Sequence, residues 1–336
     1  MDKGVSVIIC CYNSSGRLPE TLRHLANQKF NAEFGKEIIL VNNNSTDETV
    51  RTAQSGWRKL GSPFLLTVVD EPEPGLSFAR ARGVERAGYA YLVFCDDDNW
   101  LSDDYLDKVY SQFETLPEQA GMIGGSGKAV FENERLGRNS PAPATGPQSS
   151  MEGDITEREA FVYGAGMAVK KEVFDTMSSY RLKFLLTDRI GKVMSSGGDA
   201  EICMLAVILG YRIYYYSGLE FRHFMPDQRL TPEAALKGVI GVANSKFILN
   251  LYGIIIRSRR SLWILLVYPF IEMITSFKLL GRKEGFGSYS LAESRLIGKT
   301  RLRNLLMSFV SYYLEVPYFL KLRRIARINS PFIKHK

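Results

Sequence analysis

The stretch YLVFCDDDN at residues 91–99 places five apolar side chains directly before three consecutive acids. The run Tyr91–Cys95 is typical of a buried strand, because it is short, continuously apolar and bounded by polar residues. Three carboxylates in one turn repel one another, and a hard divalent cation such as Mg²⁺ or Mn²⁺ would relieve the repulsion. The alternative is a solvated acidic turn that begins the next helix, which the sequence predicts over 104–116.

The residues before this stretch alternate between apolar runs and helical patterns. Strands are predicted at Val5–Cys10, Glu37–Asn42 and Phe64–Val69. Helices are predicted at 18–28 and 77–87, and another begins near Ser45, where Ser45 and Glu48 have the spacing of a capping box. Near-continuous apolar strands that alternate with helices predict an α/β fold, with a mostly parallel sheet flanked by helices.

The pattern is looser between residues 120 and 235. Strands are predicted at Met122–Phe131, Phe161–Val169 and Arg212–Tyr216, with a helix at Asp199–Leu209. Residues 132–153 are rich in Pro, Asn, Ser and Gly and predict a long loop. We therefore predict one α/β domain over residues 1–235 and a second, helical region over 236–336.

Composition excludes several classes of protein. Hydrophobic residues make up 45% and charged residues 24% of the 336 residues, which excludes disorder as the main state. Four cysteines are too few for a disulfide framework in a chain of this length. The first residues do not resemble a secretory signal, because an acid comes early and the apolar run is short.

Charge divides the chain into two parts. The net charge is +7, but residues 257–336 hold 16 Lys and Arg against 4 Asp and Glu, which leaves 27 basic and 32 acidic residues in the rest. A basic tail on a mildly acidic body predicts a phosphate-rich partner: a membrane surface, a nucleic acid or a phosphorylated substrate.

Two apolar stretches, Val239–Ile256 and Leu262–Leu280, begin the tail. They reach the length of a spanning helix only if charged residues are included. Three interpretations stay open: packing helices, a helix pair lying in the membrane interface, or spanning helices. Trp263 and Tyr268 are amphipathic anchors that favour the interface. Phe309–Leu322 is a further apolar run that is followed by basic residues.

Polar residues follow each predicted strand of the first hundred residues, where an open parallel sheet binds its ligands. They are Cys11-Tyr12-Asn13, Asn42-Asn43-Asn44, Asp70-Glu71 and Asp96-Asp97-Asp98-Asn99. No G-x-G-x-x-G follows the first strand, and no complete P-loop is present. A nucleotide bound at this edge would therefore be held through a metal and side chains.

Five ordered motifs together resemble family 2 glycosyltransferases of the GT-A fold. They are Val7-Ile8-Ile9-Cys10-Cys11-Tyr12-Asn13, Val41-Asn42-Asn43-Asn44-Ser45-Thr46-Asp47, Gly75-Leu76-Ser77-Phe78-Ala79-Arg80, Phe94-Cys95-Asp96-Asp97-Asp98 and Gly197-Gly198-Asp199-Ala200-Glu201. The resemblance covers roughly residues 4–225. It implies a nucleotide-diphospho-sugar transferase, hexosyltransferase-like and usually inverting, of the bacterial surface-polysaccharide type.

The resemblance also implies roles for single residues. It places the base and ribose near Cys11, Asn13, Asn43 and Arg80, and the ribose or sugar near Asp96 and Asp97. The last acid of this DXD-like motif, Asp98, would hold Mn²⁺ or Mg²⁺, and His223 is a second candidate ligand. The chain departs from the family where Cys10-Cys11 replaces Pro-Thr and Asn42-Asn43 replaces an Asp pair.

Asp199 matches the general base of the family, and Gly197-Gly198 before it allow a tight turn at a helix start. Glu201 is the reserve candidate. The implied partners are a nucleotide-sugar, a UDP-sugar first, a glycan or lipid-linked acceptor and an anionic membrane surface bound by the tail, but no nucleic acid. The expected location is cytoplasmic, peripheral at the inner face of the cell membrane. The alternatives are a sugar nucleotidyltransferase and a non-catalytic binder of nucleic acid or membrane.

Overall fold

The computed structural model describes residues 2–139, 149–186, 196–257, 263–286 and 289–329. The chain forms two compact units: Met1–Lys183 with Tyr211–Leu230, and Phe184–Gly210 with Thr231–Lys336. The second unit thus includes residues 184–210, which the sequence analysis places in the first domain. The middle of the loop predicted at 132–153, and the basic residues Lys334 and Lys336, lie outside the described residues.

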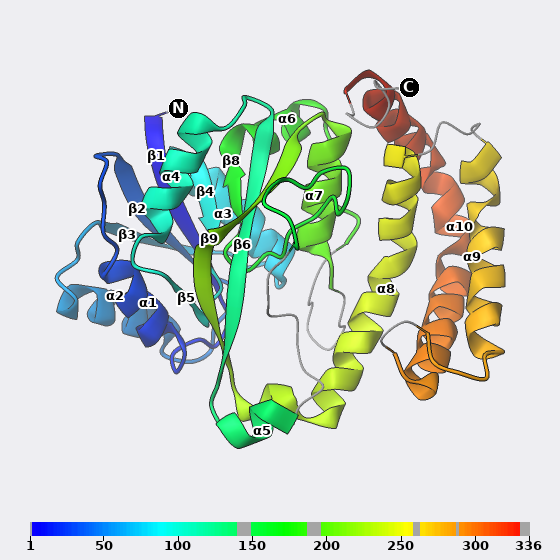
Figure 1. Ribbon diagram of the computed structural model, residues 1–336, viewed down its shortest axis with the longest axis horizontal. Coiled ribbons are helices and arrows are strands. Elements are labelled where there is room, and N and C mark those ends of the chain that lie inside the picture. The colour runs from blue at the N-terminus through cyan, green and yellow to red at the C-terminus, as the bar shows by residue number, and fades with distance from the viewer. Residues whose placement is uncertain (1, 140–148, 187–195, 258–262, 287–288, 330–336) are drawn as a thin grey trace. The chain divides into compact units, whose positions relative to one another are not determined.

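One sheet forms the centre of the first unit (Figure 1). Its nine strands within the described residues have the order β3-β2-β1-β4-β8-β6-β9-β5, with β7 paired to β9. Strands β1 to β4 pair in parallel, as do β6 and β9, whereas β5, β7 and β8 run antiparallel to their neighbours. The predicted α/β fold with a mostly parallel sheet is confirmed. The strands are β1 (Asp2–Cys11), β2 (Gly35–Asn42), β3 (Leu65–Asp70), β4 (Tyr89–Phe94), β5 (Asn99–Leu101), β6 (Ala120–Phe131), β7 (Gly153–Asp154), β8 (Ala168–Lys170) and β9 (Arg212–Met225).

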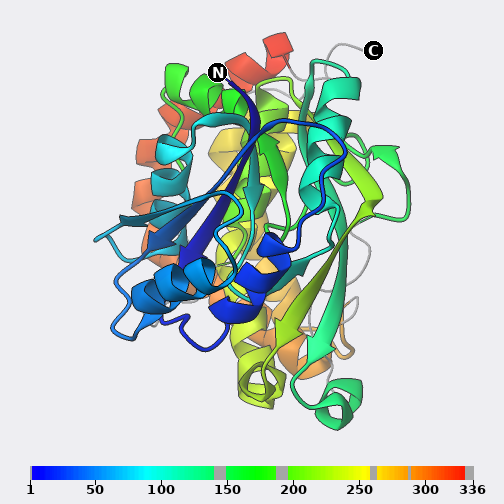
Figure 2. The ribbon, with the colours of Figure 1, turned by 90° about the vertical axis from the view of Figure 1, so that its left-hand side faces the viewer.

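Helices cover both faces of the parallel strands (Figures 1 and 2). On one face, α1 (Leu18–Ala26), α2 (Thr49–Lys59) and α4 (Tyr105–Thr115) enclose the main core. On the other, α3 (Leu76–Arg86) packs so closely that a Cβ at Gly83 would lie 2.4 Å from Ile8 Cγ2. The unit also contains α5 (Glu134–Asn139), α6 (Lys171–Ser179) and a short 3₁₀ helix, η1 (Asp227–Leu230). Burial on both faces explains why these strands are continuously apolar.

Two local predictions are wrong. The capping box at Ser45 and Glu48 does not form, because α2 begins at Thr49 and Asp47 Oδ1 accepts a hydrogen bond from the Thr49 N–H at 3.1 Å. The strand predicted at 161–169 is limited to Ala168–Lys170. Val162 and Met167 are buried without belonging to a strand, and a short apolar run does not distinguish a strand from a buried loop.

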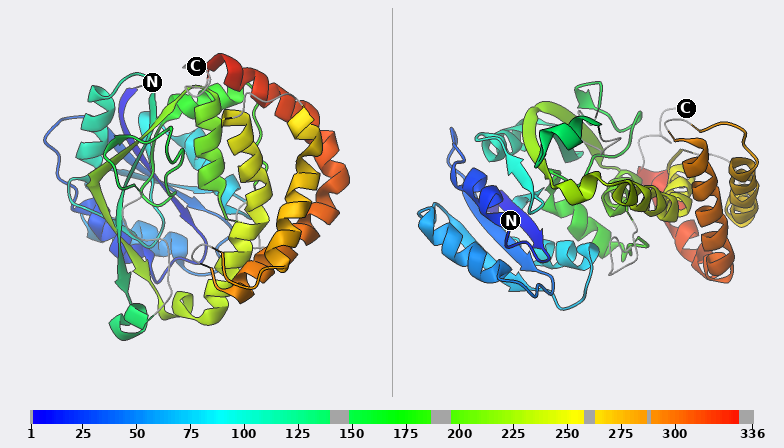
Figure 3. Two further views of the ribbon diagram at one scale, coloured as in Figure 1. Left: turned by 45° about the vertical axis from the view of Figure 1, so that its right-hand side comes forward. Right: turned by 90° about the horizontal axis from the view of Figure 1, so that it is seen from below.

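The described part of the second unit is helical and contains α7 (Gly198–Ile208), α8 (Pro232–Arg257), α9 (Trp263–Leu280) and α10 (Leu291–Asn329). Helices α8, α9 and α10 run alongside one another in both views of Figure 3. Among the described residues, α8 and α9 are long and apolar enough to cross a membrane, judged by length and composition alone. The apolar stretch 262–280 matches α9 within one residue, whereas the stretch 239–256 begins seven residues after the start of α8. The apolar run 309–322 covers only about a third of α10.

A buried ion pair joins α9 to α10. Glu272 is 2% exposed and Arg301 is 8% exposed, and the Arg301 guanidinium donates hydrogen bonds to Glu272 Oε1. The Tyr268 hydroxyl lies 3.4 Å from Glu272 Oε2. The pair gives a structural reason for the acid that interrupts the apolar sequence of α9.

Replacing Glu272 by Ala should lower the free energy of unfolding by about 3–5 kcal/mol, because it leaves the Arg301 charge buried without its carboxylate. Denaturant unfolding followed by far-UV circular dichroism measures the change. The double variant Glu272→Leu/Arg301→Met is the control and should recover most of the loss, since it removes both charges. Equal stability of Glu272→Ala and the natural chain would contradict this account.

Candidate functional site

The carboxyl ends of the parallel strands bring their polar segments together, as predicted. Asn42, at the end of β2, donates from Nδ2 to Asp70 Oδ1 at the end of β3, at 2.8 Å. Beyond β1, Asn13 adopts a positive φ of 49° and its Oδ1 accepts the Thr46 N–H at 2.8 Å. Side-chain amides therefore fix the geometry of this edge.

Asn43 holds the loop that leads into α3. Its Nδ2 donates to the carbonyl oxygens of Glu71 at 2.9 Å and Glu73 at 2.6 Å, and its Oδ1 accepts the Gly75 N–H at 2.8 Å. An Asn side chain offers two donors and two acceptor positions, so only one acceptor position remains for a ligand. The predicted nucleotide contact of Asn43 thus coexists with a clear structural task.

Cys11 and Tyr12 differ in what they present to a ligand. The Cys11 side chain is buried in the core, which leaves its backbone as the group that could touch a nucleotide. Tyr12 is 61% exposed at the same edge. The sequence analysis did not single it out, although an exposed aromatic ring beside Asn13 offers a flat apolar face for a base.

Arg80 lies on α3 behind the acidic turn. It is buried, and its guanidinium carbon lies 5.7 Å from the centroid of the Phe94 ring at the end of β4. This cation–π contact fixes the position of the charge next to the carboxyl edge. The contact of Arg80 with a nucleotide stays a prediction.

The acidic turn carries three carboxylates in different surroundings. Asp96 is half-buried, whereas Asp97 and Asp98 are buried. Asp97 Oδ2 accepts a hydrogen bond from Arg17 Nη2 at 2.6 Å. Burial, reinforced by the charge of Asp98, raises the pKa of Asp97, and the contact with Arg17 only partly offsets this. Sequence reasoning missed Arg17, which follows β1 by six residues.

Asp98 faces two basic side chains. Strand β5 pairs with β9 so that Asn99 lies opposite His223, which brings the imidazole to the acidic turn. His223 Nε2 lies 3.4 Å from Asp98 Oδ1, and Arg229 Nη2 lies 3.0 Å from Asp98 Oδ2. Burial alone would raise the pKa of Asp98, but contact with His223 and the Arg229 charge outweigh it, and the pKa lies below its usual value.

The chemistry of this cluster suits one divalent cation shared with a phosphate ligand. Both Asp98 oxygens are buried and make no directed hydrogen bond within the described residues. Those residues contain no group of three or more His, Cys, Asp and Glu side chains around one point. Mg²⁺ and Mn²⁺ sites often use one or two protein ligands and complete their shell with water and substrate phosphates. Asp98 and His223 fit such a site.

Asp199 lies in the second unit, at the start of α7. The residue before the helix, Gly197, has a φ of 119°, and a Cβ there would lie 3.1 Å from Leu249 Cδ1. The predicted tight glycine turn is confirmed. Asp199 is half-buried and its Oδ1 accepts the Ala200 N–H at 2.8 Å.

Glu201, the reserve base, has a structural role in the same unit. Its side chain is 0% exposed and accepts hydrogen bonds from the Leu185 N–H at 2.7 Å, the Leu186 N–H at 2.9 Å and the Tyr252 hydroxyl at 2.7 Å. A carboxylate with three internal donors and no solvent contact is poorly placed to take a proton from a substrate. Asp199 is therefore the better candidate.

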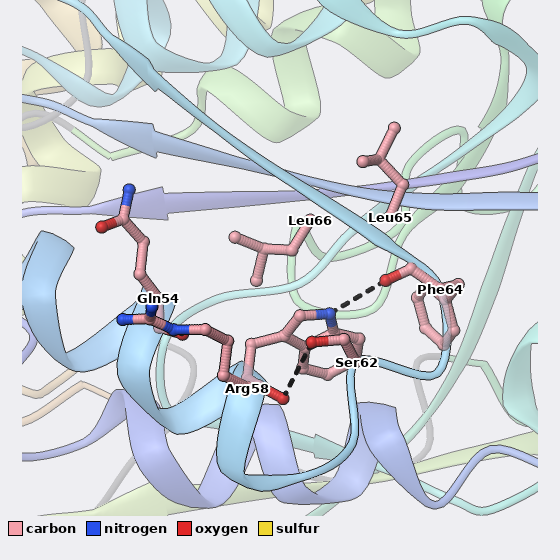
Figure 4. Close-up of a pocket in the computed structure, with 7 residues that line it drawn as sticks. Gln54, Arg58, Ser62, Phe64, Leu65 and Leu66 are labelled. Atoms are coloured by element: carbon pink, nitrogen blue, oxygen red, sulfur yellow. Dashed lines mark hydrogen bonds between the residues drawn. The ribbon is translucent and has the colours of Figure 1, made fainter.

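A pocket of about 670 Å³ lies elsewhere in the first unit, between α2 and β3 (Figure 4). Apolar side chains of Trp57, Phe64, Leu65 and Leu66 form much of its wall, and the indole N–H of Trp57 donates to the Phe64 carbonyl at 2.9 Å. No residue of the acidic turn lines it, so the pocket is not the site described above.

Comparison with known proteins decides the family. The profile described as "Glycosyl transferase family 2" matches residues 6–177, half of the chain. The chain belongs to glycosyltransferase family 2. The match includes the acidic turn and Arg80 but ends before Asp199 and His223, so it does not bear on the roles predicted for these two residues.

Curated relatives match this family 2 glycosyltransferase over about two fifths of its length. EpsH of Bacillus subtilis is 30% identical over 129 residues, which are 38% of this chain and 35% of EpsH. Poly-beta-1,6-N-acetyl-D-glucosamine synthase of Staphylococcus epidermidis is 25% identical over a match that covers 40% of this chain and 31% of the synthase. The matches thus span about a third of the length of these relatives.

Solved structures confirm the GT-A fold of this family 2 glycosyltransferase. The Staphylococcus aureus TarS 1–349 complex with UDP-GlcNAc has a TM-score of 0.58 and 15% identity, and the match covers 97% of this chain and 89% of that one. The mannosyltransferase PcManGT of Pyrobaculum calidifontis, in complex with GDP-Man and Mn²⁺, has a TM-score of 0.53 and 16% identity, with 100% and 89% covered. At this identity the likeness shows the fold alone.

The family 2 glycosyltransferase has a basic residue that the sequence analysis missed, Arg229. Arg229→Ala should weaken binding of a nucleoside diphosphate by about 10- to 100-fold, the effect of one lost charge-assisted contact. Calorimetric titration measures it. Arg222→Ala, on the exposed side of β9, is the matched control and should bind normally. If Arg229→Ala binds the diphosphate as tightly as the natural chain, Arg229 serves only to neutralise Asp98.

Proposed function

We propose that the chain is an inverting, metal-dependent glycosyltransferase. It would move a sugar from a nucleotide-diphosphate donor to a hydroxyl of a glycan or lipid-linked acceptor. The observation that carries the proposal is the cluster of Asp98, His223 and Arg229 beside the Asp97–Arg17 pair, at the carboxyl edge of a GT-A sheet. Such a cluster combines one strong anionic ligand with the positive charge that a diphosphate needs.

The donor would lie along the carboxyl edge. Tyr12 would stack on the base, Asn13, Asn43 and the Cys11 backbone would surround the base and ribose, and Arg80 would add positive charge. Asp96 and Asp97 would accept hydrogen bonds from the ribose or sugar hydroxyls. A UDP-sugar is our first candidate, because TarS is solved with UDP-GlcNAc; GDP-Man is the second, because PcManGT is solved with it.

The leaving diphosphate is where charge develops. Asp98 and His223 would hold Mn²⁺ or Mg²⁺, which when bound supplies Lewis-acid neutralisation of the departing phosphate oxygens. Arg229 contributes a fixed positive charge at the same place, and Asp98 orients it at 3.0 Å. PcManGT, which shares the fold, is solved with Mn²⁺, and this supports the proposed requirement.

Asp199 would act as the general base. A single displacement with inversion needs a carboxylate that accepts the proton of the acceptor hydroxyl while the oxygen attacks the anomeric carbon. The C–O bond to the acceptor forms as the bond to the diphosphate breaks, and the proton moves to Asp199. The glycine turn at 197–198 holds Asp199 at the start of helix α7.

The biological setting that we propose is surface-polysaccharide synthesis at the cytoplasmic face of the cell membrane, with the C-terminal region on anionic lipid. The relatives named above, among them a poly-beta-1,6-N-acetyl-D-glucosamine synthase, support this setting. Membership of family 2 disfavours the two alternatives, a sugar nucleotidyltransferase and a nucleic-acid binder.

A panel of nucleotide-sugars with Mn²⁺ or Mg²⁺ tests the proposal. We expect one donor to raise the melting temperature and to be hydrolysed slowly in the absence of acceptor, with both effects lost in EDTA. Release of pyrophosphate from a nucleoside triphosphate and a sugar phosphate would favour the nucleotidyltransferase instead. No stabilisation and no hydrolysis with any donor would contradict the proposal.

A further inference from the structure

The solvent-exposed side of α9 is apolar, although a polar side is expected there. Its solvent-exposed residues between positions 263 and 277 are all apolar, and each is exposed by more than a third. One row of them runs through Trp263, Leu266, Phe270, Ile274 and Phe277. Steps of three and four residues place this row on one face of the helix. The exposed stripe of a helix in water is normally charged or polar.

A second apolar row on α10 continues this surface. Leu306, Val310 and Leu314 are each more than two-thirds exposed and also lie four residues apart. Two contacts join the rows: the ring of Phe270 lies 5.9 Å from that of Phe309, and the Tyr313 hydroxyl donates to the Leu266 carbonyl at 3.2 Å. We call the two rows together the α9–α10 apolar face.

Positive charge borders the α9–α10 apolar face at both ends. Where α9 ends, exposed Lys278 follows the row of α9, and exposed Lys299 and Arg303 precede the row of α10. At the other end, exposed Lys321 and Arg324 follow the row of α10. Two copies of this surface placed together would bring like charges into proximity, which disfavours a second chain as the occupant. A partner with an apolar interior and an anionic surface complements the α9–α10 apolar face.

We propose that the α9–α10 apolar face lies flat on an anionic lipid bilayer, with its side chains in the interface between headgroups and acyl chains. The row from Trp263 to Phe277 is about 21 Å long at 1.5 Å per residue, shorter than the hydrocarbon core of about 30 Å. The opposite side of α9 carries Glu272, which is buried against Arg301 of α10. One apolar side, one protein-packed side and basic ends are the features of an interfacial helix pair.

The inference deepens the proposed function, and so rests on it, because it names the surface by which the enzyme would reach a lipid-linked acceptor. Experiments can disprove the membrane-docking proposal and the proposed function independently of each other. Vesicle binding of the α9–α10 apolar face needs no donor, and slow donor hydrolysis needs no vesicle.

The test uses the full chain and vesicles of phosphatidylcholine and phosphatidylglycerol in equal parts. We expect sedimentation with these vesicles, weakened by salt, and a shift of tryptophan emission to shorter wavelength. Trp263 is 70% exposed, whereas Trp57 is buried and Trp100 is half-buried in the first unit, so Trp263→Phe should remove most of the shift. No binding by the natural chain would overturn the proposal.

Two triple variants locate the surface. Phe270→Gln/Ile274→Gln/Phe277→Gln should bind these vesicles at least about tenfold more weakly, because three large apolar side chains no longer enter the interface. Leu65→Gln/Leu136→Gln/Met151→Gln is the matched control, since it alters three exposed apolar residues of the first unit and should bind normally. Equal binding of the two triple variants would overturn the assignment.

Two further outcomes exclude other occupants. The natural chain should be released from cell membranes by alkaline carbonate, and retention until detergent is added would overturn flat docking in favour of spanning. Light scattering should show no dimer that depends on Phe270, Ile274 and Phe277. A dimer lost in the α9 triple variant, without vesicle binding by the natural chain, would assign the surface to a second copy.

Discussion

Asp199→Asn is expected to bind the donor normally and to turn over at least about 100-fold more slowly, within the range for lost acid–base catalysis. The amide cannot take the proton of the acceptor hydroxyl. Its oxygen still accepts the Ala200 N–H, so the start of α7 is retained. Initial rates with saturating donor and acceptor measure the loss, and titration with the nucleoside diphosphate measures donor affinity.

Glu201→Gln is the control for Asp199→Asn. It replaces a carboxylate two residues away whose oxygens accept three internal hydrogen bonds, so we expect a lower melting temperature and nearly normal turnover in the folded fraction. If Asp199→Asn turns over normally, Asp199 is not the base. If Glu201→Gln alone loses turnover while it stays folded, the two roles are exchanged.

Asp98→Asn should lower turnover at limiting donor by at least about 100-fold, and should raise the Mn²⁺ concentration that gives half-maximal activity. The substitution removes the carboxylate that lies next to His223 and Arg229. A neutral amide is a weak ligand for a hard cation and no longer holds the guanidinium in place. Activity as a function of Mn²⁺ concentration, at limiting and at saturating donor, measures both effects.

His223→Ala separates the two ligands of this cluster. We expect it to weaken Mn²⁺ binding by about tenfold while the fold is retained, since His223 is one of the two proposed protein ligands and is partly exposed. Unchanged Mn²⁺ dependence would remove His223 from the site. Unchanged Mn²⁺ dependence in Asp98→Asn would remove the metal site altogether.

Much of the first unit could be predicted because its strands are buried on both faces. Val5–Cys10 and Glu37–Asn42 are continuous apolar runs, and the ends of these two strands are recovered within three residues. Short strands were harder to predict, because three residues are too few for a period to be recognised: β5 was missed, and β8 was predicted only as the end of a longer strand. These strands form by pairing with distant partners.

The candidate site could be predicted where its residues follow strands and not where tertiary pairing supplies them. Asp96–Asp98 come directly after β4, so their position at the carboxyl edge follows from sheet topology. Arg229 reaches Asp98 from η1, 131 positions along the chain, and Arg17 reaches Asp97 across 80. A lone arginine in a loop carries no periodic signal that would reveal such a partner.

The same limitation explains the boundary between the units. Composition changes near residue 236, where the apolar helices begin, but residues 184–210 carry no compositional mark of the second unit. Their place depends on Glu201, whose carboxylate contacts Leu185, Leu186 and Tyr252. Such a contact cannot be read from residue order.

The Glu201–Tyr252 contact limits how this enzyme can be shortened for crystallisation. Cutting the chain near residue 236, where the composition changes, would remove most of α8. The buried carboxylate of Glu201 would then lose the hydrogen bond that the Tyr252 hydroxyl donates to it. Helix α7, which begins with the proposed base, would lose the neighbour on which it packs. The C-terminal helices that composition marks as a separate tail therefore also support the helix that carries the proposed base.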